Sequence, residues 1–248
     1  MQLTILGCSG TFPGPSGPCS SYLVEADGFR LLIDVGNGSL GALQARVGLL
    51  GVDAIMLSHL HGDHCLDLIA YSYARRYHPD APLPVLPVYG PKDTQKRLCG
   101  AFEDWPEDAL CEVYDFRDLV PGRRAIGPFS VVMDRVSHPI EAFGFRITAD
   151  GKTVTYSGDS GSSENLDKLA AGSHLFLCEA SWHDSPRNPP GVHMSGREAG
   201  QTAYRASTRH LVLTHIVPWA DAPALVDEAR SAFDGPVTLA QPGLVFDL

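Results

Sequence analysis

The chain has 248 residues, of which 44% are hydrophobic and 19% charged, a composition typical of a soluble globular protein. This length favours one domain over residues 1–248. With 19 basic and 29 acidic residues the net charge is -10, and no run of Lys or Arg occurs, which argues against tight binding along a nucleic-acid backbone. No stretch has the roughly 20 apolar residues of a membrane span, and the start lacks a basic signal-peptide segment, so we expect no membrane association and a cytoplasmic protein.

Short β-type runs recur along the chain and are separated by helical patterns. The predicted strands cover residues 3–6, 21–26, 31–35, 53–57, 85–90, 130–136, 143–147, 153–158, 174–180, 210–216 and 236–241. The predicted helices cover residues 39–50, 65–77, 92–103, 163–171, 196–207 and 221–233. Strands are neighbours in the first half and alternate with helices in the second, a pattern that predicts an α/β protein with two helix-covered sheets.

The segment SHLHGDH (58–64) directly follows the apolar run VDAIML, which predicts a buried strand. His59 and His61 are two residues apart on an extended segment, so both side chains project to the same side. Asp63 follows Gly62, and His64 can begin the next helix. One catalytic metal that keeps an open coordination position would not take all four of these ligands from a single loop. The segment therefore predicts two metal ions.

Further candidate ligands come after three later strands. His138 comes after SVVMDRVS, Asp159 after TVTYSG and His215 after HLVLT. A packed sheet can deliver such residues to one shared edge, and seven ligand-type residues at matching positions argue against unrelated structural roles.

These motifs resemble the metallo-β-lactamase superfamily. SHLHGDH is similar to its HxHxDH signature, and LLIDVGNG, His138, SGDS and THI are similar to its other motifs, in the same order. The resemblance implies an αββα sandwich with a dinuclear site at the sheet edges, in which Asp159 bridges the two ions. The implied ligands of one metal are His59, His61, His138 and Asp159, and those of the other are Asp63, His64, Asp159 and His215. Zinc is the usual ion, although Mn²⁺ and Fe²⁺ accept the same ligand types.

The charge of such a site suits a phosphate. Two divalent ions, two carboxylates, neutral imidazoles and a bridging hydroxide leave a single net positive charge, even in an acidic protein. Divalent metals also acidify bound water to a pKa near about 7, which supplies hydroxide at neutral pH.

The segment between Asp159 and His215 bears on the reaction. EAS, which contains Glu179, and HMSGREA, which begins at His193, resemble motifs of the RNase Z branch. In that branch the histidine, oriented by the glutamate, assists departure of the leaving oxygen. A carboxylate beside an imidazole favours the imidazolium, which can donate a proton. We assign His193, Glu179 and Asp63 as catalytic residues.

The substrate class is narrowed by the segment after the third ligand motif. RNase Z proper carries a flexible tRNA-binding arm between the strands that correspond to FGFRI and TVTYSGD, and here only TADGK connects them, a hairpin-sized link with a DG turn signal. Several segments, including LGCSGTFPGP and RRYHPD, resemble compact cyclic nucleotide-degrading phosphodiesterases of actinobacteria. This resemblance implies hydrolysis of 3′,5′-cyclic nucleotides, cyclic AMP above all, to the 5′ nucleotide by attack of a metal-bridging hydroxide.

Other functions stay open at this stage. They are an RNase Z-like tRNA 3′ endonuclease or other RNA phosphodiesterase, a hydrolase of another ester class, and a non-catalytic metal-stabilised binding protein. The expected partner is a small cyclic nucleotide rather than an extended nucleic acid, and homodimers are common in the family. Aromatic and histidine side chains beside the candidate loops could contact the base. They are Tyr77, His78, Trp182, His183 and Trp219.

Overall fold

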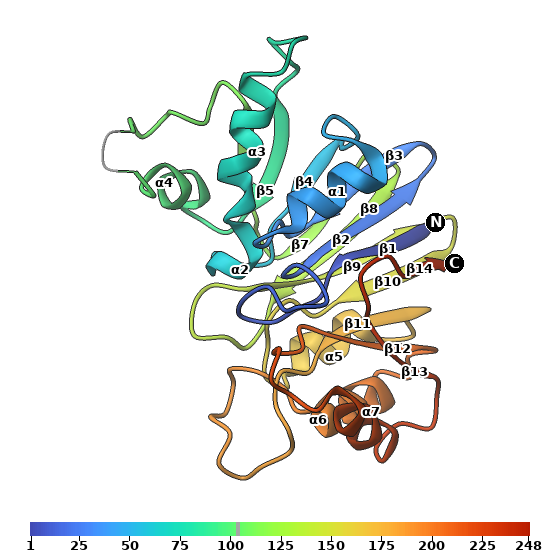
Figure 1. The fold of residues 1–248 in the computed structure, drawn as a ribbon. Coiled ribbons are helices and arrows are strands. Elements are labelled where there is room, and N and C mark those ends of the chain that lie inside the picture. Colours follow the sequence, from blue (N-terminus) through green and yellow to red (C-terminus); the bar gives the residue numbers. More distant parts are fainter. Residues whose placement is uncertain (103–104) are drawn as a thin grey trace.

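Two seven-stranded sheets form the two inner layers of the protein, and helices cover both outer faces (Figure 1). The computed structural model describes residues 1–102 and 105–248. Helices α1 (Ser39–Val47), α3 (Asp67–Arg76) and α4 (Thr94–Cys99) pack on one sheet. Helices α5 (Glu164–Ala170), α6 (Gly196–Arg205) and α7 (Ala222–Arg230) pack on the other. This four-layer αββα sandwich confirms the predicted fold class.

The first sheet is antiparallel on one side and parallel on the other. Its β1 to β3 strands pair antiparallel, and β3 to β6 pair parallel. In order across the sheet, the strands are β14 (Val245–Asp247), β1 (Gln2–Gly7), β2 (Ser21–Ala26), β3 (Phe29–Ile33), β4 (Ala54–Met56), β5 (Leu86–Gly90) and β6 (Tyr114–Asp118).

The second sheet has the same mixture of pairings. Strands β7 to β10 pair antiparallel, and β10 to β13 pair parallel. In order across the sheet, the strands are β13 (Val237–Leu239), β12 (Leu211–Thr214), β11 (Leu175–Glu179), β10 (Lys152–Tyr156), β9 (Phe143–Ala149), β8 (Phe129–Arg135) and β7 (Gly122–Ile126).

The core lies between the sheets, with a second apolar layer outside each of them. Leu3 and Ile5 of β1 meet Phe145 of β9 and Val154 of β10 in the central layer, where all four are fully buried. Such alternation of inward and outward side chains is what two sheets packed face to face require. The outer layers join each sheet to its helices, so the positions of the strand ends are fixed from both sides.

The observed elements match all eleven predicted strands and add three that the sequence did not indicate. These are β6, β7 and β14, which carry charged or exposed residues and lie at the sheet edges. Their side chains do not show the apolar runs of the central strands, because an edge strand has less surface to bury. The predicted helix 65–77 is two helices, α2 (Gly62–Cys65) and α3. The predicted helix 92–103 is the shorter α4, and residue 103 lies outside the described residues.

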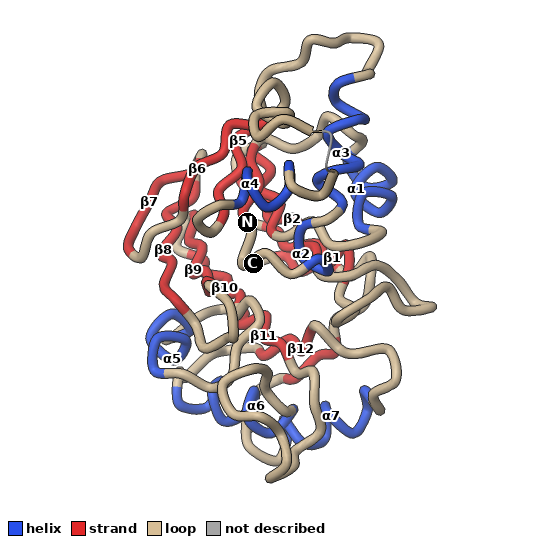
Figure 2. The backbone as a smooth tube through the Cα atoms, turned by 90° about the vertical axis from the view of Figure 1, so that its left-hand side faces the viewer, coloured by secondary structure: helices blue, strands red, loops and turns tan. Residues whose placement is uncertain are grey.

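The strands that precede the candidate ligands point their carboxyl ends toward one side of the sandwich. In the first sheet β1, β3, β4 and β5 run in one direction, and in the second sheet β8, β10, β11 and β12 do so. Figure 2 faces this side, with α2 and several connecting loops toward the viewer. None of the helices in the described part of the chain has the length and apolarity needed to cross a membrane.

A substitution at Gly36 tests how closely the backbone segments pack on this side of the sandwich. A side chain at Gly36 would overlap the backbone carbonyl oxygen of Asp63 and would lie 2.7 Å from Cβ of Cys19. We expect Gly36→Ala to lower the free energy of unfolding by about 1–3 kcal/mol, because the crowded backbone has to shift. Thermal or urea unfolding measures the loss.

The matched control is Gly41→Ala, at an exposed position in α1 where an added Cβ meets nothing within 4 Å. Alanine is the better helix former, so this variant should gain about 0.5–1 kcal/mol. Equal stability of Gly36→Ala and the wild type would contradict the close approach of these two segments.

Candidate active site

The seven predicted ligands come together where loops leave the two sheets. Four of them come after β4 or lie on α2, and the other three come after β8, β10 and β12. The two groups of ligand atoms share one residue, and within each group the atoms lie within 4.8 Å of one another. The first group is His59, His61, His138 and Asp159, and the second is Asp63, His64, Asp159 and His215.

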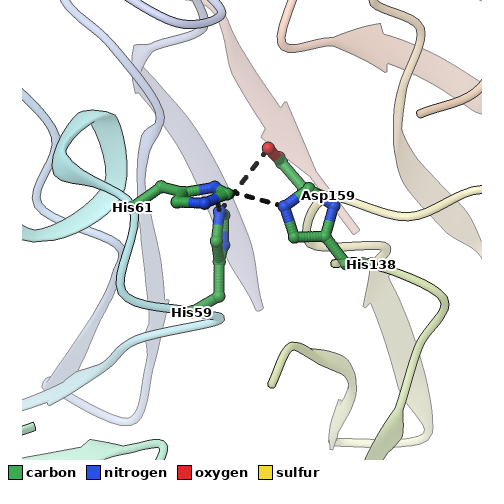
Figure 3. A group of neighbouring side chains, drawn as sticks. All are labelled: His59, His61, His138 and Asp159. Carbon is green, nitrogen blue, oxygen red and sulfur yellow. Dashed lines mark hydrogen bonds and ion pairs between the residues drawn. The ribbon is translucent and has the colours of Figure 1, made fainter. Parts of the chain in front are cut away.

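In the first group the side chains converge from both sheets (Figure 3). Nδ1 of His61 lies 3.2 Å from Nε2 of His59 and 3.2 Å from Nε2 of His138. Oδ2 of Asp159 lies 3.6 Å from Nε2 of His59. Four atoms around a tetrahedral ion, each bound at 2.0–2.1 Å, lie roughly 3.3 Å apart. The spacing of this group therefore fits a small divalent cation.

In the second group both oxygens of Asp159 lie near histidine nitrogens. Oδ1 of Asp159 lies 3.2 Å from Nε2 of His64, and Oδ2 lies 3.4 Å from Nε2 of His215. Oδ2 of Asp63 lies 3.1 Å from the same His215 nitrogen. Asp159 thus faces both groups, as a bridging ligand must.

Two buried atoms in these groups have no hydrogen-bond partner in the described part of the protein. They are Nε2 of His64 and Oδ1 of Asp159, which lie 3.2 Å from each other on side chains that are 0% and 2% exposed and hydrogen-bond to no other described group. Leaving buried polar atoms unpaired is costly, and a native structure rarely does so without a ligand. Together with the spacing, these orphan atoms show a His/Asp cluster able to bind metal ions. The ligand types do not distinguish zinc from manganese or iron.

Most of the ligand histidines are oriented through their other ring nitrogen. With Nε2 facing the ligand group, Nδ1 is left to bond to the surrounding protein, which fixes the ring. The partners of Nδ1 are Oγ of Ser58 for His59 at 3.1 Å, Oδ2 of Asp34 for His64 at 2.8 Å, the carbonyl of Val192 for His138 at 2.9 Å, and Oγ of Ser181 for His215 at 2.8 Å.

Asp34 is a functional residue that the sequence analysis did not single out. It is fully buried after β3, and its carboxylate accepts hydrogen bonds from the backbone and hydroxyl of Ser58, from His64 and from the hydroxyl of Tyr156. Its position in LLIDVGNG, at the end of an apolar run, was the available signal. The charge count made from the sequence omitted Asp34, whose carboxylate offsets the single positive charge of that count. Because Asp34 lies behind the His64 ring, the ions would still be the nearest charges to a substrate.

The electrostatics of the groups suit metal binding. Burial lowers the pKa of His59, His61 and His138, which favours the neutral imidazole that a metal needs. Burial raises the pKa of Asp63 and Asp159, but the facing histidines outweigh it and hold both pKa values below the usual range.

His64 differs from His59, His61 and His138 in the direction of its pKa shift. Burial lowers its pKa, but the carboxylates of Asp159 and Asp34 outweigh burial and raise the pKa well above the ordinary histidine value. The surrounding carboxylates thus favour a proton on His64, and a cation that binds there would displace this proton.

His193 and Glu179 form a pair beside both groups. Nδ1 of His193 lies 2.9 Å from Oε1 of Glu179 and 3.9 Å from Oδ2 of Asp159. Burial lowers the pKa of His193, but the Glu179 carboxylate and its hydrogen bond outweigh burial and raise the pKa to about 9. Nδ1 is engaged by Glu179, so Nε2 is the nitrogen left to face a substrate.

The Glu179 carboxylate is itself held in place by hydrogen bonds. It is fully buried, and its carboxylate accepts hydrogen bonds from the backbone of Ser160 and Met194 and from the hydroxyl of Ser181. Ser181 also contacts His215, so the pair and the second ligand group share a positioning residue. Ser195 and Glu198 form a capping box at the start of α6.

The five candidate base contacts are not gathered in one place. Tyr77 caps the far end of α3 from α2 and stacks on Tyr73, while His78 lies next to it, 3.6 Å from Asp80. The structure does not bring these two to the ligand groups.

The other three candidates come after β11 or β12. His183 contacts Glu228 of α7 at 3.1 Å. The Trp182 ring packs edge-on against His193, with centroids 5.0 Å apart. Trp219 is 72% exposed and lies on Phe12. Contact of any of them with a substrate stays a prediction.

Comparison with known proteins places these features among metallo-hydrolases. Residues 29–216 match the Beta-lactamase superfamily domain. An uncharacterized protein of Mycobacterium leprae is 44% identical over 253 residues, which cover 100% of this chain and 89% of that protein. The Ribonuclease Z of Mycobacterium bovis is 30% identical, covering 88% of this chain and 86% of the relative. The crystal structure of the metallo-beta-lactamase fold protein YhfI from Bacillus subtilis has a TM-score of 0.87 at 27% identity and covers 99% of both chains.

Asp34→Asn tests the role of the buried carboxylate behind His64. Asn has nearly the same shape and tolerates the positive φ of 55° at this position, so the backbone can be kept. Loss of the charge should weaken the metal-binding affinity of the second group by about 10–100-fold, as removal of such outer partners typically does. Titration with zinc against a chelating indicator measures the affinity.

A control for this experiment is Asp53→Asn, which removes a surface carboxylate whose Oδ2 accepts a hydrogen bond from the Arg30 backbone. Its metal affinity should equal that of the wild type. If Asp34→Asn binds two metal ions as tightly as the wild type, Asp34 has no part in orienting the ligand.

Proposed function

Since the chain belongs to the Beta-lactamase superfamily, we propose that it is a metal-dependent phosphodiesterase that hydrolyses 3′,5′-cyclic nucleotides, cyclic AMP in particular, to the 5′ nucleotide. The observation that carries this proposal is the His193–Glu179 pair beside the two ligand groups. A hydrolase acting on an ester with a poor leaving group needs a proton donor, and this pair supplies one.

The protein residues would divide the work between binding and proton transfer. Two divalent ions, held by the seven ligands, would supply a nucleophile from water at neutral pH and offset the charge of the phosphate. Glu179 orients the His193 ring through Nδ1. Nε2 of His193 then donates its proton to the 3′ oxygen as the bond to phosphorus breaks. The buried carboxylate of Glu179 stabilises the imidazolium before the transfer.

The size of the substrate is limited by the loops around the site. Strand β9 ends at Ala149 and β10 begins at Lys152, so only Asp150 and Gly151 connect them. Both have positive φ, 52° and 71°, as a tight hairpin of this kind requires. The arm that RNase Z uses to hold tRNA would be expected at this connection. Its replacement by a two-residue turn and the net charge of -10 support a small substrate.

A second candidate is an RNA phosphodiesterase. The 30% identity to Ribonuclease Z over most of both chains favours it, and the same His193–Glu179 chemistry would serve an RNA 3′ oxygen. The two candidates differ in how much of the substrate the protein must hold. A cyclic nucleotide needs only the metal site and a place for its base, whereas tRNA also needs an extended basic surface.

A substrate panel separates the two candidates. We expect the metal-loaded protein to hydrolyse cyclic AMP to 5′ AMP and to leave a precursor tRNA intact at the same enzyme concentration. Chromatography of nucleotides and gel analysis of the RNA measure the products, with 2′,3′-cyclic AMP and cyclic GMP in parallel. Cleavage of the tRNA precursor without turnover of any cyclic nucleotide would replace the proposed function with the second candidate.

His193→Ala tests the proton donor. The variant should hydrolyse cyclic AMP about 10²–10⁴-fold more slowly, because its alkyl leaving oxygen needs a proton. Hydrolysis of bis(p-nitrophenyl) phosphate should fall much less, because nitrophenolate leaves without one. Steady-state rates on both substrates give the comparison.

His174→Ala is the matched control, since His174 precedes β11 at the end opposite Glu179. It should have wild-type rates on both substrates. An equal loss on the two substrates in His193→Ala would rule out proton donation to the leaving group.

A further inference from the structure

An exposed aromatic pair stands on two loops that contact the metal ligands. The rings of Phe12 and Trp219 lie 5.2 Å apart at an angle of 38°. Phe12 is 40% exposed and Trp219 is 72% exposed. Neither side chain belongs to the hydrophobic clusters found among the described residues. Two large apolar rings therefore remain in water next to each other instead of being buried in the core.

The loop that carries Phe12 is tied to the second ligand group. The loop comes after β1, and the backbone N–H of Thr11 donates to Oδ2 of Asp63 at 2.8 Å. Thr11 has a positive φ of 67°, a conformation that residues other than glycine adopt only when their surroundings hold them there. Because Phe12 is the next residue, its Cα lies about 3.8 Å from that of Thr11.

The loop that carries Trp219 is tied to the same group and to the first loop. His215 belongs to the second ligand group. The next residue, Ile216, makes two backbone hydrogen bonds to the loop that carries Phe12. The N–H of Gly10 donates to the Ile216 carbonyl at 3.0 Å, and the N–H of Ile216 donates to the Cys8 carbonyl at 3.1 Å. The two aromatic residues thus flank the Asp63 and His215 side of the site on a joined support.

The chemistry of the proposed substrate requires a surface of this kind. A nucleotide bound by its phosphate at the ligand groups extends through its ribose to a flat base with two π-faces. Aromatic side chains stack on such faces, and this stacking tolerates differences between bases. Trp182 is less suited to the role, because its ring is already packed against His193. Their exposed rings, on loops bonded to the second ligand group, distinguish Phe12 and Trp219.

We propose that Phe12 and Trp219 form the stacking surface for the base of the nucleotide, which rests on the proposed function for the identity of the substrate. The phosphate would lie at the ligand groups and the base on the aromatic pair. Both parts of the substrate would then be recognised by loops that come after β1 and β12, and no arm outside the sandwich would be needed.

The test compares two ribose phosphates, one with a base and one with a hydroxyl in its place. Adenosine 5′-monophosphate and ribose 5-phosphate are titrated into the metal-loaded protein by calorimetry. We expect Trp219→Ala and Phe12→Ala each to weaken binding of adenosine 5′-monophosphate by about 10-fold or more, the usual effect of removing one stacking side chain. Binding of ribose 5-phosphate should change by less than about twofold, since the stacking energy belongs to the base. Trp219→Phe should keep most of the wild-type affinity for the nucleotide, because an aromatic ring remains at this position.

The control is Tyr204→Ala, which removes an aromatic side chain of α6 that is 64% exposed. It should bind both ligands like the wild type. The proposal is overturned if the wild type binds both ligands equally, or if the Phe12 and Trp219 variants lose both to the same extent. Retained preference for the nucleotide without hydrolysis of cyclic AMP would contradict the proposed function and leave the stacking surface standing.

Discussion

The buried carboxylate of Asp34 is the interaction on which the geometry of the site depends. It accepts hydrogen bonds from Ser58 after β4, from His64 of α2, and from Tyr156 at the end of β10 in the opposite sheet. A buried carboxylate is costly unless it is fully paired, so these donors and the acceptor hold one another in place. The same contacts fix the distance between the sheets at the edge where the ligands meet. The tyrosine pair extends this connection, because Tyr22 packs on Tyr156 and contacts Thr214 before His215.

This arrangement concentrates like and unlike charges in a small, largely buried volume. Four carboxylates, those of Asp34, Asp63, Asp159 and Glu179, are nearly buried, and the ligand histidines and His193 lie between or beside them. Nε2 of His64 and Oδ1 of Asp159 lie 3.2 Å apart on side chains that are almost fully buried. The scaffold must therefore be rigid enough to hold these carboxylates close together, because in a flexible protein their repulsion would move them apart. Two sheets packed on each other, with a helical layer outside each, provide that rigidity.

The sequence predicted the central strands and picked out the ligand-type residues that meet in the structure, because strands and the SHLHGDH motif are local patterns. Apolar runs mark strands that are buried on both faces, and SHLHGDH keeps its spacing whatever the rest of the chain does. The edge strands β6 and β7 have no such run, since one side of each faces solvent or a less buried layer. The role of Asp34 depends on Tyr156, which is 122 residues away, and the stacking of Phe12 on Trp219 joins two distant loops. Contacts of that kind follow from the fold and are invisible to a local pattern.

The division between scaffold and loops also explains why the ligand groups do not identify a substrate. Every ligand is fixed by a strand end or by α2, so the same ions could serve several esters. Under the proposed function, discrimination comes from groups farther from phosphorus, on the loops after β1, β11 and β12. Those loops are bonded to the ligands themselves, as the contact of Thr11 with Asp63 illustrates. Under the proposed function, one mononucleotide extends from the ligand groups to these loops.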